Sequence, residues 1–286
     1  MLASNAFRAM AFLVGVAAAS GAAVAQTTAD RTQDKVAFPA HKIVGNLYYV
    51  GTATLNSYLI TTPQGHILIN TNFEDTVPLL TASVEKVGFK MSDIKIILGS
   101  HAHLDHMQAD AAVKELTGGA MVMAMEQDVP ALKAMKSASG KPHPIDRVLK
   151  DGEQVTLGGA TLTAHLTPGH TRGCTTWTTA IADAGRTYNV VIVCAGLQAD
   201  VRLVNNTNYP EIADDFARSN KTFKTLQPDV FLGAHSWFFD LAGKYKKVGG
   251  TTNPYVDPAG YKSWVNAQEK SYNSVLAEQK KNPPTN

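Results

Sequence analysis

The sequence is poor in cysteine, in net charge and in long hydrophobic runs, and each shortage excludes a class of protein. Two cysteines among 286 residues cannot make a disulfide scaffold or a thiolate zinc cage, because either needs about four. A formal net charge of +2 gives no electrostatic reason to expect nucleic acid as a partner. Any metal chemistry must therefore come from the nine histidines and the carboxylates.

The first 25 residues have the pattern of an export signal. Arg8 is the one early charge, an apolar stretch rich in Ala and Val follows, and Ala23-Val24-Ala25 is a small-x-small ending. The alternative is a membrane anchor, but the strongly apolar part is shorter than the ~20 residues of a span. We therefore expect a signal peptide over 1–25, cleavage before Gln26, and a periplasmic or secreted protein with no membrane contact after cleavage.

The remainder predicts one folded domain. Residues 26–40 are polar and aperiodic, which is typical of a flexible N-terminal arm, and 41–286 contain two successive groups of short strands, each followed by helix and strand. No Gly/Ser-rich linker separates the groups. The pattern predicts an α/β domain in which two mixed β-sheets lie between helices. The expected elements include strand Ile94–Leu98, helix Gln127–Met135, a hairpin of Thr175–Ile181 with Tyr188–Cys194, and helix Trp264–Leu276.

A cluster of ligand-type side chains follows the strand Ile94–Leu98. The sequence there reads HAHLDH, and in an extended loop His101, His103 and Asp105 project to one side while His106 turns away at the start of the next helix. The alternative is a solvated polar loop, in which imidazoles this close together would repel one another on protonation. Four such residues within six positions can serve two adjacent metal ions.

Two further histidines follow later predicted strands. His170 lies in the segment TPGHT and His235 in LGAH; each taken alone is an ordinary loop histidine. Together with the first cluster they supply six ligands, so each of two metals would have three protein ligands and an open position for water. Nitrogen and carboxylate donors without thiolate suit zinc, although the donor types also allow iron or manganese.

The segments HAHLDH, PGHT and GAH, in this order within a doubled sheet-and-helix pattern, resemble the metallo-β-lactamase superfamily over essentially the whole mature chain. The resemblance implies an αβ/βα four-layer sandwich and two Zn²⁺ ions per chain. It also implies the class B β-lactamase subclass whose first zinc is held by three His and whose second is held by one Asp and two His. The first set would be His101, His103 and His170, and the second Asp105, His106 and His235.

One position separates the branches of this superfamily. Thioesterases, lactonases and nucleases of the fold usually carry a metal-bridging Asp after the strand that follows the fourth ligand. Leu197 stands at that position here, and Asp200 is too far along the chain to match. The missing Asp and the export signal both favour the β-lactamase branch.

The same segment departs from the β-lactamase subclass. Many members place Ser or a hydroxyl pair there to hold the substrate carboxylate, whereas this chain has Cys194, Ala195 and Gly196. We expect Gln198, water or the N-terminal arm to make that contact instead. Arg172, beside His170, is a further candidate for contact with an anionic group.

The two cysteines are placed symmetrically about residue 184 in the predicted hairpin. Cys174 and Cys194 would then face each other across the strands, close enough for a disulfide in an oxidising compartment. An alignment shifted by one residue would instead put Cys194 beside the second zinc, as a ligand or an oxidation-sensitive neighbour.

The residues together predict hydrolysis of the β-lactam amide bond, carbapenems included, and hence antibiotic inactivation. Two zinc ions sharing a water would generate hydroxide at neutral pH, which attacks the carbonyl without an acyl-enzyme. Asp105 would be the catalytic residue that orients the hydroxide and relays a proton to the nitrogen. We expect a monomer acting on a small molecule. The alternatives are a lactonase or thioesterase of the same fold and a non-catalytic zinc-binding protein of the cell envelope.

Overall fold

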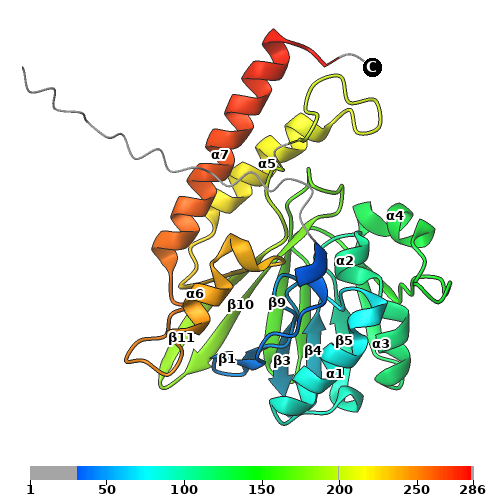
Figure 1. Ribbon diagram of the computed structural model, residues 1–286, viewed down its shortest axis with the longest axis vertical. Coiled ribbons are helices and arrows are strands. Elements are labelled where there is room, and N and C mark those ends of the chain that lie inside the picture. The colour runs from blue at the N-terminus through cyan, green and yellow to red at the C-terminus, as the bar shows by residue number, and fades with distance from the viewer. Residues whose placement is uncertain (1–30, 199, 285–286) are drawn as a thin grey trace, which may run out of the picture.

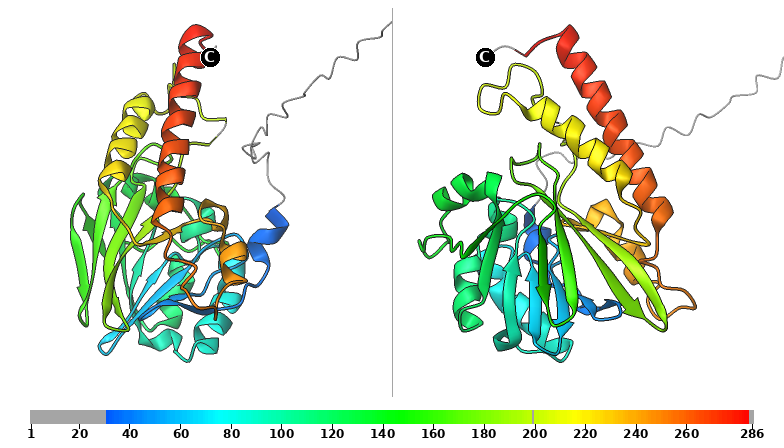
Figure 2. Two further views of the ribbon diagram at one scale, coloured as in Figure 1. Left: turned by 90° about the vertical axis from the view of Figure 1, so that its left-hand side faces the viewer. Right: turned by 180° about the vertical axis from the view of Figure 1, so that it is seen from behind.

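The computed structural model describes residues 31–198 and 200–284. Two β-sheets face each other between layers of helices (Figures 1 and 2), which confirms the α/β sandwich. The predicted signal peptide lies outside the described residues.

The first sheet contains seven strands in chain order. Its first four strands form antiparallel pairs, and the pairs from β4 to β7 are parallel. The strands are β1 (His41–Val44), β2 (Leu47–Tyr49), β3 (Tyr58–Thr62), β4 (Gly65–Ile69), β5 (Ile94–Leu98), β6 (Met121–Met125) and β7 (Arg147–Leu149). The connecting helices are α1 (Val77–Lys86), α2 (Leu104–Met107), α3 (Asp110–Leu116) and α4 (Val129–Ala134).

The second sheet has five strands in the order β12-β11-β10-β9-β8. They are β8 (Gln154–Leu157), β9 (Ala160–Leu166), β10 (Thr175–Asp183), β11 (Arg186–Val193) and β12 (Val230–Gly233), and the later helices are α5 (Ile212–Thr225), α6 (Leu241–Tyr245) and α7 (Pro258–Lys281). Helices α5 and α7 lie side by side in both figures. Helix α7 begins six residues before the predicted Trp264 because Pro258 occupies its first turn and the Asp257 carboxylate accepts from Gly260 N.

The main core lies between the two sheets. Along β4, Ile67 and Ile69 point into this core, whereas Leu68 between them packs in a second core on the other face, with residues of α1 and α3. Both faces of the strand are therefore buried, which explains an apolar run without polar alternation.

The described part of the N-terminal arm is docked on the domain. Residues Arg31–Lys35 form a 3-10 helix, and the Phe38 ring packs against Tyr49 and Tyr245 with centroids 5.6 and 5.1 Å away. Val36 remains exposed. Phe38 thus fixes the point at which the chain enters the first sheet.

The hairpin of β10 and β11 has a register that differs from the prediction by one residue. Trp177 pairs with Ile192 and Asp183 with Arg186, so the symmetry point falls between residues 184 and 185. The turn is Ala184-Gly185, both at positive φ, which matches the right-handed twist of the strands. Cys174 and Cys194 lie just beyond the paired residues, and they face each other closely enough for the predicted disulfide.

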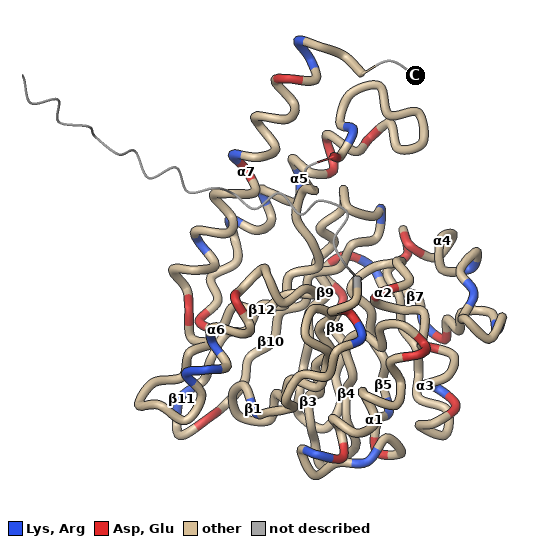
Figure 3. Tube along the Cα trace, in the orientation of Figure 1, with Lys and Arg blue, Asp and Glu red and all other residues tan. Residues whose placement is uncertain are grey.

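Residues of both charge signs are interspersed along the outer helices and loops in Figure 3, as the small net charge leads one to expect. Among the residues that the structure describes, no helix combines the length and apolar character needed to cross a membrane.

Candidate metal centre

The loop after β5 carries the first cluster and enters helix α2 earlier than predicted. Because α2 begins at Leu104, Asp105 lies in the helix with His106 and does not extend the row formed by His101 and His103. The Asp105 carboxylate consequently lies 3.5 Å from His106 Nε2. The local prediction that Asp105 sides with the two preceding histidines is wrong.

Three histidines form the first ligand set. His101 Nε2 lies 3.1 Å from His170 Nε2, and the ring of His103 is 4.7 Å from each of the other two. One nitrogen from each residue lies within 4.8 Å of the others. The β5–α2 and β9–β10 loops meet here because β5 and β9, in different sheets, both end at this edge of the sandwich.

The second ligand set combines Asp105 and His106 of α2 with His235, which follows β12. His106 Nε2 lies 3.2 Å from His235 Nε2, and Asp105 Oδ2 is 3.8 Å from the latter atom. The ring of His106 is 4.2 Å from that of His101, so the two sets are immediate neighbours. The structure thus groups the six residues as the resemblance implied.

Burial favours the neutral form of three of these imidazoles. It is the largest cause that lowers the pKa of His170 to about 3 and that of His235 to about 3, and it also lowers the pKa of His101 well below the usual value; neighbouring histidines add to each shift. Neutral imidazoles present lone pairs to a cation. Two nitrogens bound to one tetrahedral zinc at 2.0–2.1 Å would be about 3.3–3.4 Å apart, close to the observed 3.1 and 3.2 Å. The residues therefore fit zinc.

A polar segment after β4 supports both sets and was not identified from the sequence. Asn70 Oδ1 accepts from Ser100 N at 2.8 Å, and Thr71 N and Asn72 N both donate to His106 O at 3.0 Å. Asn70 and Asn72 have positive φ, which Asn adopts more readily than most residues. The two asparagines in INTN, directly after a buried strand, were the available signal.

Two exposed apolar residues lie next to ligands of the centre. Leu104 is 46% and Trp237 44% exposed, whereas His101 is only 1% exposed. The Trp237 ring stacks on His235 at 4.1 Å between centroids, and Leu104 directly follows the exposed His103. These two side chains therefore give the centre apolar borders.

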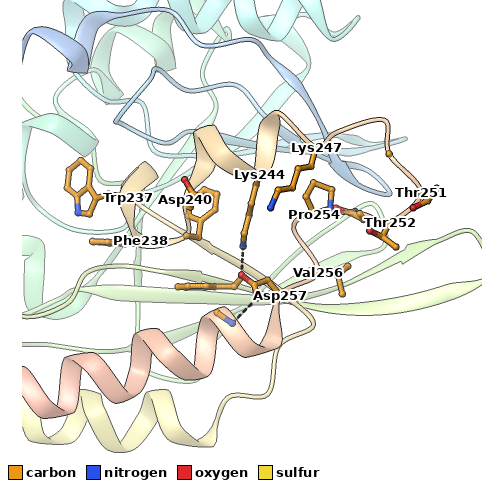
Figure 4. A pocket seen from close by; sticks show the side chains of 15 residues that line it. Trp237, Phe238, Asp240, Lys244, Lys247, Thr251, Thr252, Pro254, Val256 and Asp257 are labelled. Atoms are coloured by element: carbon orange, nitrogen blue, oxygen red, sulfur yellow. Dashed lines mark hydrogen bonds and ion pairs between the residues drawn. The ribbon is translucent and has the colours of Figure 1, made fainter. Parts of the chain in front are cut away.

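Trp237 and Phe238 also border a cavity of about 770 Å³. Figure 4 shows this cavity, with the ion pair of Lys244 and Asp257 on its wall. Its lining contains none of the six ligands, so it is separate from the metal centre.

The structure joins Cys174 and Cys194 in a disulfide with Cα atoms 5.8 Å apart. Both residues are fully buried. Cys194 Sγ lies 3.4 Å from His101 Nδ1 and 3.3 Å from Ser100 O. The disulfide thus packs behind the first ligand set. Cys194 is not beside the second ligand set, where an alignment shifted by one residue would have placed it.

The two expected substrate contacts differ in their surroundings. The Arg172 guanidinium donates to Glu211 Oε2 at 3.0 Å and to Asn208 O at 3.1 Å, and it lies 4.0 Å from the Tyr209 ring. Its charge is thus matched within the protein, and it links the His170 loop to the segment before α5. Gln198 is exposed in the loop after β11.

The sandwich and its ligands place the protein among metal-dependent hydrolases, and solved structures narrow the class. FEZ-1 metallo-β-lactamase from Legionella gormanii is 43% identical over 86% of this chain and 98% of its own, with a TM-score of 0.82. BJP-1, a subclass B3 metallo-β-lactamase of Bradyrhizobium japonicum, is 34% identical over 88% of this chain and 99% of its own, with a TM-score of 0.80. Residues 51–183 match the family described as the metallo-β-lactamase superfamily. The chain belongs to this superfamily, which confirms the resemblance.

Curated relatives match a shorter region. A hydroxyacylglutathione hydrolase of Hyphomonas neptunium is 34% identical over 116 residues, which are 41% of this chain and 40% of that protein. A probable metallo-hydrolase of Burkholderia pseudomallei is 31% identical over 111 residues, 37% of either chain. The matches thus span about two fifths of the length of these relatives.

Proposed function

We propose that the protein is a zinc-dependent β-lactamase that opens the β-lactam amide bond, carbapenems included, and so inactivates antibiotics. The observation that carries the proposal is the division of six ligands into a His/His/His and an Asp/His/His set, in a chain similar to solved metallo-β-lactamases over nearly their whole length. The predicted signal peptide supports a periplasmic or secreted location, where such substrates are met.

Two zinc ions, when bound, would polarise the carbonyl and lower the pKa of a water toward ~7. Asp105 is the protein group that we assign to proton transfer. Its carboxylate oxygen lies 3.5 Å from His106 Nε2 and 3.8 Å from His235 Nε2, and its side chain is 14% exposed, which is consistent with access to a bound substrate. It orients the attacking water, accepts its proton and passes that proton to the ring nitrogen as the C–N bond breaks.

The borders of the centre suit a small molecule with an apolar body. Leu104 next to His103 and Trp237 stacked on His235 supply exposed apolar surface beside the ligands. Gln198 is the polar side chain that we propose for the substrate carboxylate, because Ala195 and Gly196 offer no side-chain donor. Arg172 is a weaker candidate, since Glu211 already binds it.

Thioester hydrolysis is the second candidate, because the curated relatives include hydroxyacylglutathione hydrolases. The loop after β11 argues against it. Leu197 stands where thioesterases of the fold usually carry a metal-bridging Asp, and its backbone N–H donates to Gln268 of α7. The nearest later carboxylate, Asp200, is exposed. Among the described residues, the groups that could hold a metal ion contain no carboxylate from this loop.

The test compares the two substrates on one preparation. The purified protein with zinc is mixed with a carbapenem, whose absorbance is followed, and separately with a hydroxyacylglutathione thioester. We expect rapid carbapenem loss, which chelation abolishes and added zinc restores, and slow thioester cleavage. Thioester cleavage without carbapenem loss would favour the second candidate, and tight zinc binding without either reaction would favour a non-catalytic zinc protein.

A further inference from the structure

Asp128 occupies a helix-capping position but does not cap the helix. It ends the 3-10 turn Glu126–Asp128 after β6 and directly precedes α4, which has Pro130 in its first turn. An Asp at this position ordinarily accepts from the first N–H groups of the helix. Here its side chain makes no such bond and is directed into the protein, where the residue is only 3% exposed.

The Asp128 carboxylate instead binds the two loops that carry the first ligand set. Oδ2 accepts from Ala102 N at 2.8 Å and from Thr171 Oγ1 at 2.9 Å, and Oδ1 accepts from Gly173 N at 2.7 Å. Ala102 lies between His101 and His103, and Thr171 directly follows His170. One carboxylate is therefore bonded beside all three histidines.

The hydrogen bonds of Asp128 depend on the negative charge of its carboxylate and on the close approach of Gly173. Three donors within 2.9 Å offset the cost of burying a carboxylate, although burial raises the pKa of Asp128 above its usual value. A Cβ added at Gly173 would stand 2.5 Å from Asp128 N and 2.6 Å from its carboxylate carbon. Only glycine at position 173 leaves room for this contact.

We propose that Asp128 is a positioning residue that sets the spacing of His101, His103 and His170 for a metal ion. It fixes the β5–α2 loop and the β9–β10 loop to one rigid group, so that the imidazoles are arranged before the ion binds. The inference rests on the zinc-binding part of the proposed function and is independent of the identity of the substrate.

The test measures zinc affinity by competition with a chromophoric chelator and, in parallel, the visible absorption spectrum of the Co²⁺ form. Asp128→Asn keeps the shape but replaces one acceptor oxygen with an NH₂ group. We expect its affinity for the first zinc to fall about 10- to 100-fold, as for other groups that orient metal ligands, and the Co²⁺ spectrum to change. Wild-type affinity together with a wild-type spectrum would overturn the proposal.

Asp257→Asn is the matched control. Asp257 also accepts from a backbone N–H, that of Gly260 at 2.8 Å, and its second partner is the Lys244 ammonium group at 2.9 Å, but it lies on the wall of the separate cavity (Figure 4). We expect a lower unfolding temperature with unchanged zinc affinity and spectrum. Equal losses of affinity in the Asp257 and Asp128 variants would assign both to general destabilisation and overturn the proposal.

Two further variants approach the same contact from the other side. Gly173→Ala should reproduce the loss of affinity, and combining it with Asp128→Asn should add little, because both break one interaction. If Asp128→Asn does not fold, Thr171→Val removes one donor only and should weaken zinc binding by a smaller factor. Full additivity of the double variant, or unchanged affinity in Thr171→Val when Asp128→Asn does not fold, would contradict the inference. None of these readouts uses a β-lactam, so they stand whether or not the protein hydrolyses one.

Discussion

The two ligand sets lie side by side but are held by different means. The His101, His103 and His170 set is backed by a buried carboxylate, by the Cys174–Cys194 disulfide 3.4 Å from His101 Nδ1, and by Trp177, whose indole N–H donates to Gly99 O. The Asp105, His106 and His235 set is held by backbone donors to His106 O and by an exposed indole ring stacked on His235.

The difference indicates a division of roles between the two ligand sets. Side-chain hydrogen bonds around the first set connect loops of both sheets, and the disulfide connects two segments of the second sheet, which suits a rigid ion site. The second set contains the one carboxylate among the ligands and borders the exposed Trp237, which suits contact with a reacting substrate. The largest changes in turnover should therefore come from the second set, and the largest changes in stability from the first.

The strongest test of this division is Asp105→Asn. The amide no longer accepts a proton, so we expect the turnover number to fall about 10²- to 10⁴-fold, the usual contribution of a general base. Steady-state carbapenem kinetics are measured together with zinc content. Near-normal turnover with two zinc ions per chain would remove Asp105 from proton transfer.

Replacing both cysteines, Cys174→Ala with Cys194→Ala, breaks the covalent support of the first set. The bond closes a loop with a sequence separation of 20 residues, and we expect the free energy of unfolding to fall by about 3 kcal/mol on the chain-entropy estimate. Urea denaturation of the zinc-loaded protein measures this loss. An unchanged urea midpoint would show that the non-covalent contacts alone hold the first set in place.

The stability of the zinc-free protein should depend on pH through both sets. Burial lowers the pKa of His170 and of His235 to about 3, below the ~6.5 of an unfolded chain. The unfolded chain therefore binds protons first, and stability is lost as pH falls from about 6.5 toward 3, by on the order of 1 kcal/mol per histidine per pH unit. Urea midpoints at pH 7.5, 6.5 and 5.5 test the slope, which His170→Ala and His235→Ala should each reduce. A flat profile would refute buried neutral imidazoles.

The smallest expected effect concerns the aromatic support of the second set. Trp237→Ala removes a stacked ring worth about 0.5–1.5 kcal/mol, so we expect a rise of about 2- to 13-fold in the dissociation constant of the zinc at the second set. Trp237→Phe keeps a ring and serves as the control, with a smaller change expected. Equal losses in the two variants would show that stacking is not the interaction that matters.

The sequence predicted some parts of this architecture well because they are local. The apolar run Ile94–Leu98 and the helical spacing from Val77 appear in the structure as β5 and α1. The strand β7 and the short helix α6 were not expected, since three and five residues are too short to establish a hydrophobic period.

Other predictions were wrong or missing because a tertiary contact outweighed the local sequence preference. Asp105 was assigned to an extended loop, but α2 starts at Leu104 and turns its carboxylate toward His106. Asp128, followed by Val-Pro, has the signature of a plain helix cap, and nothing in the local sequence indicates that its side chain binds loops 26 and 45 residues away.

By itself the sequence determined the ligand types and their number, the α/β class and the family, because donor chemistry and hydrophobic periodicity are carried by neighbouring residues. Only the tertiary structure decided that Asp105 sides with His106 and His235 at short distance, that Asp128 holds the loops of the first set, and that Trp237 stacks on His235. Those properties depend on strands of two sheets ending at one edge, and distances between segments far apart in the chain are set by the packing of the sheets.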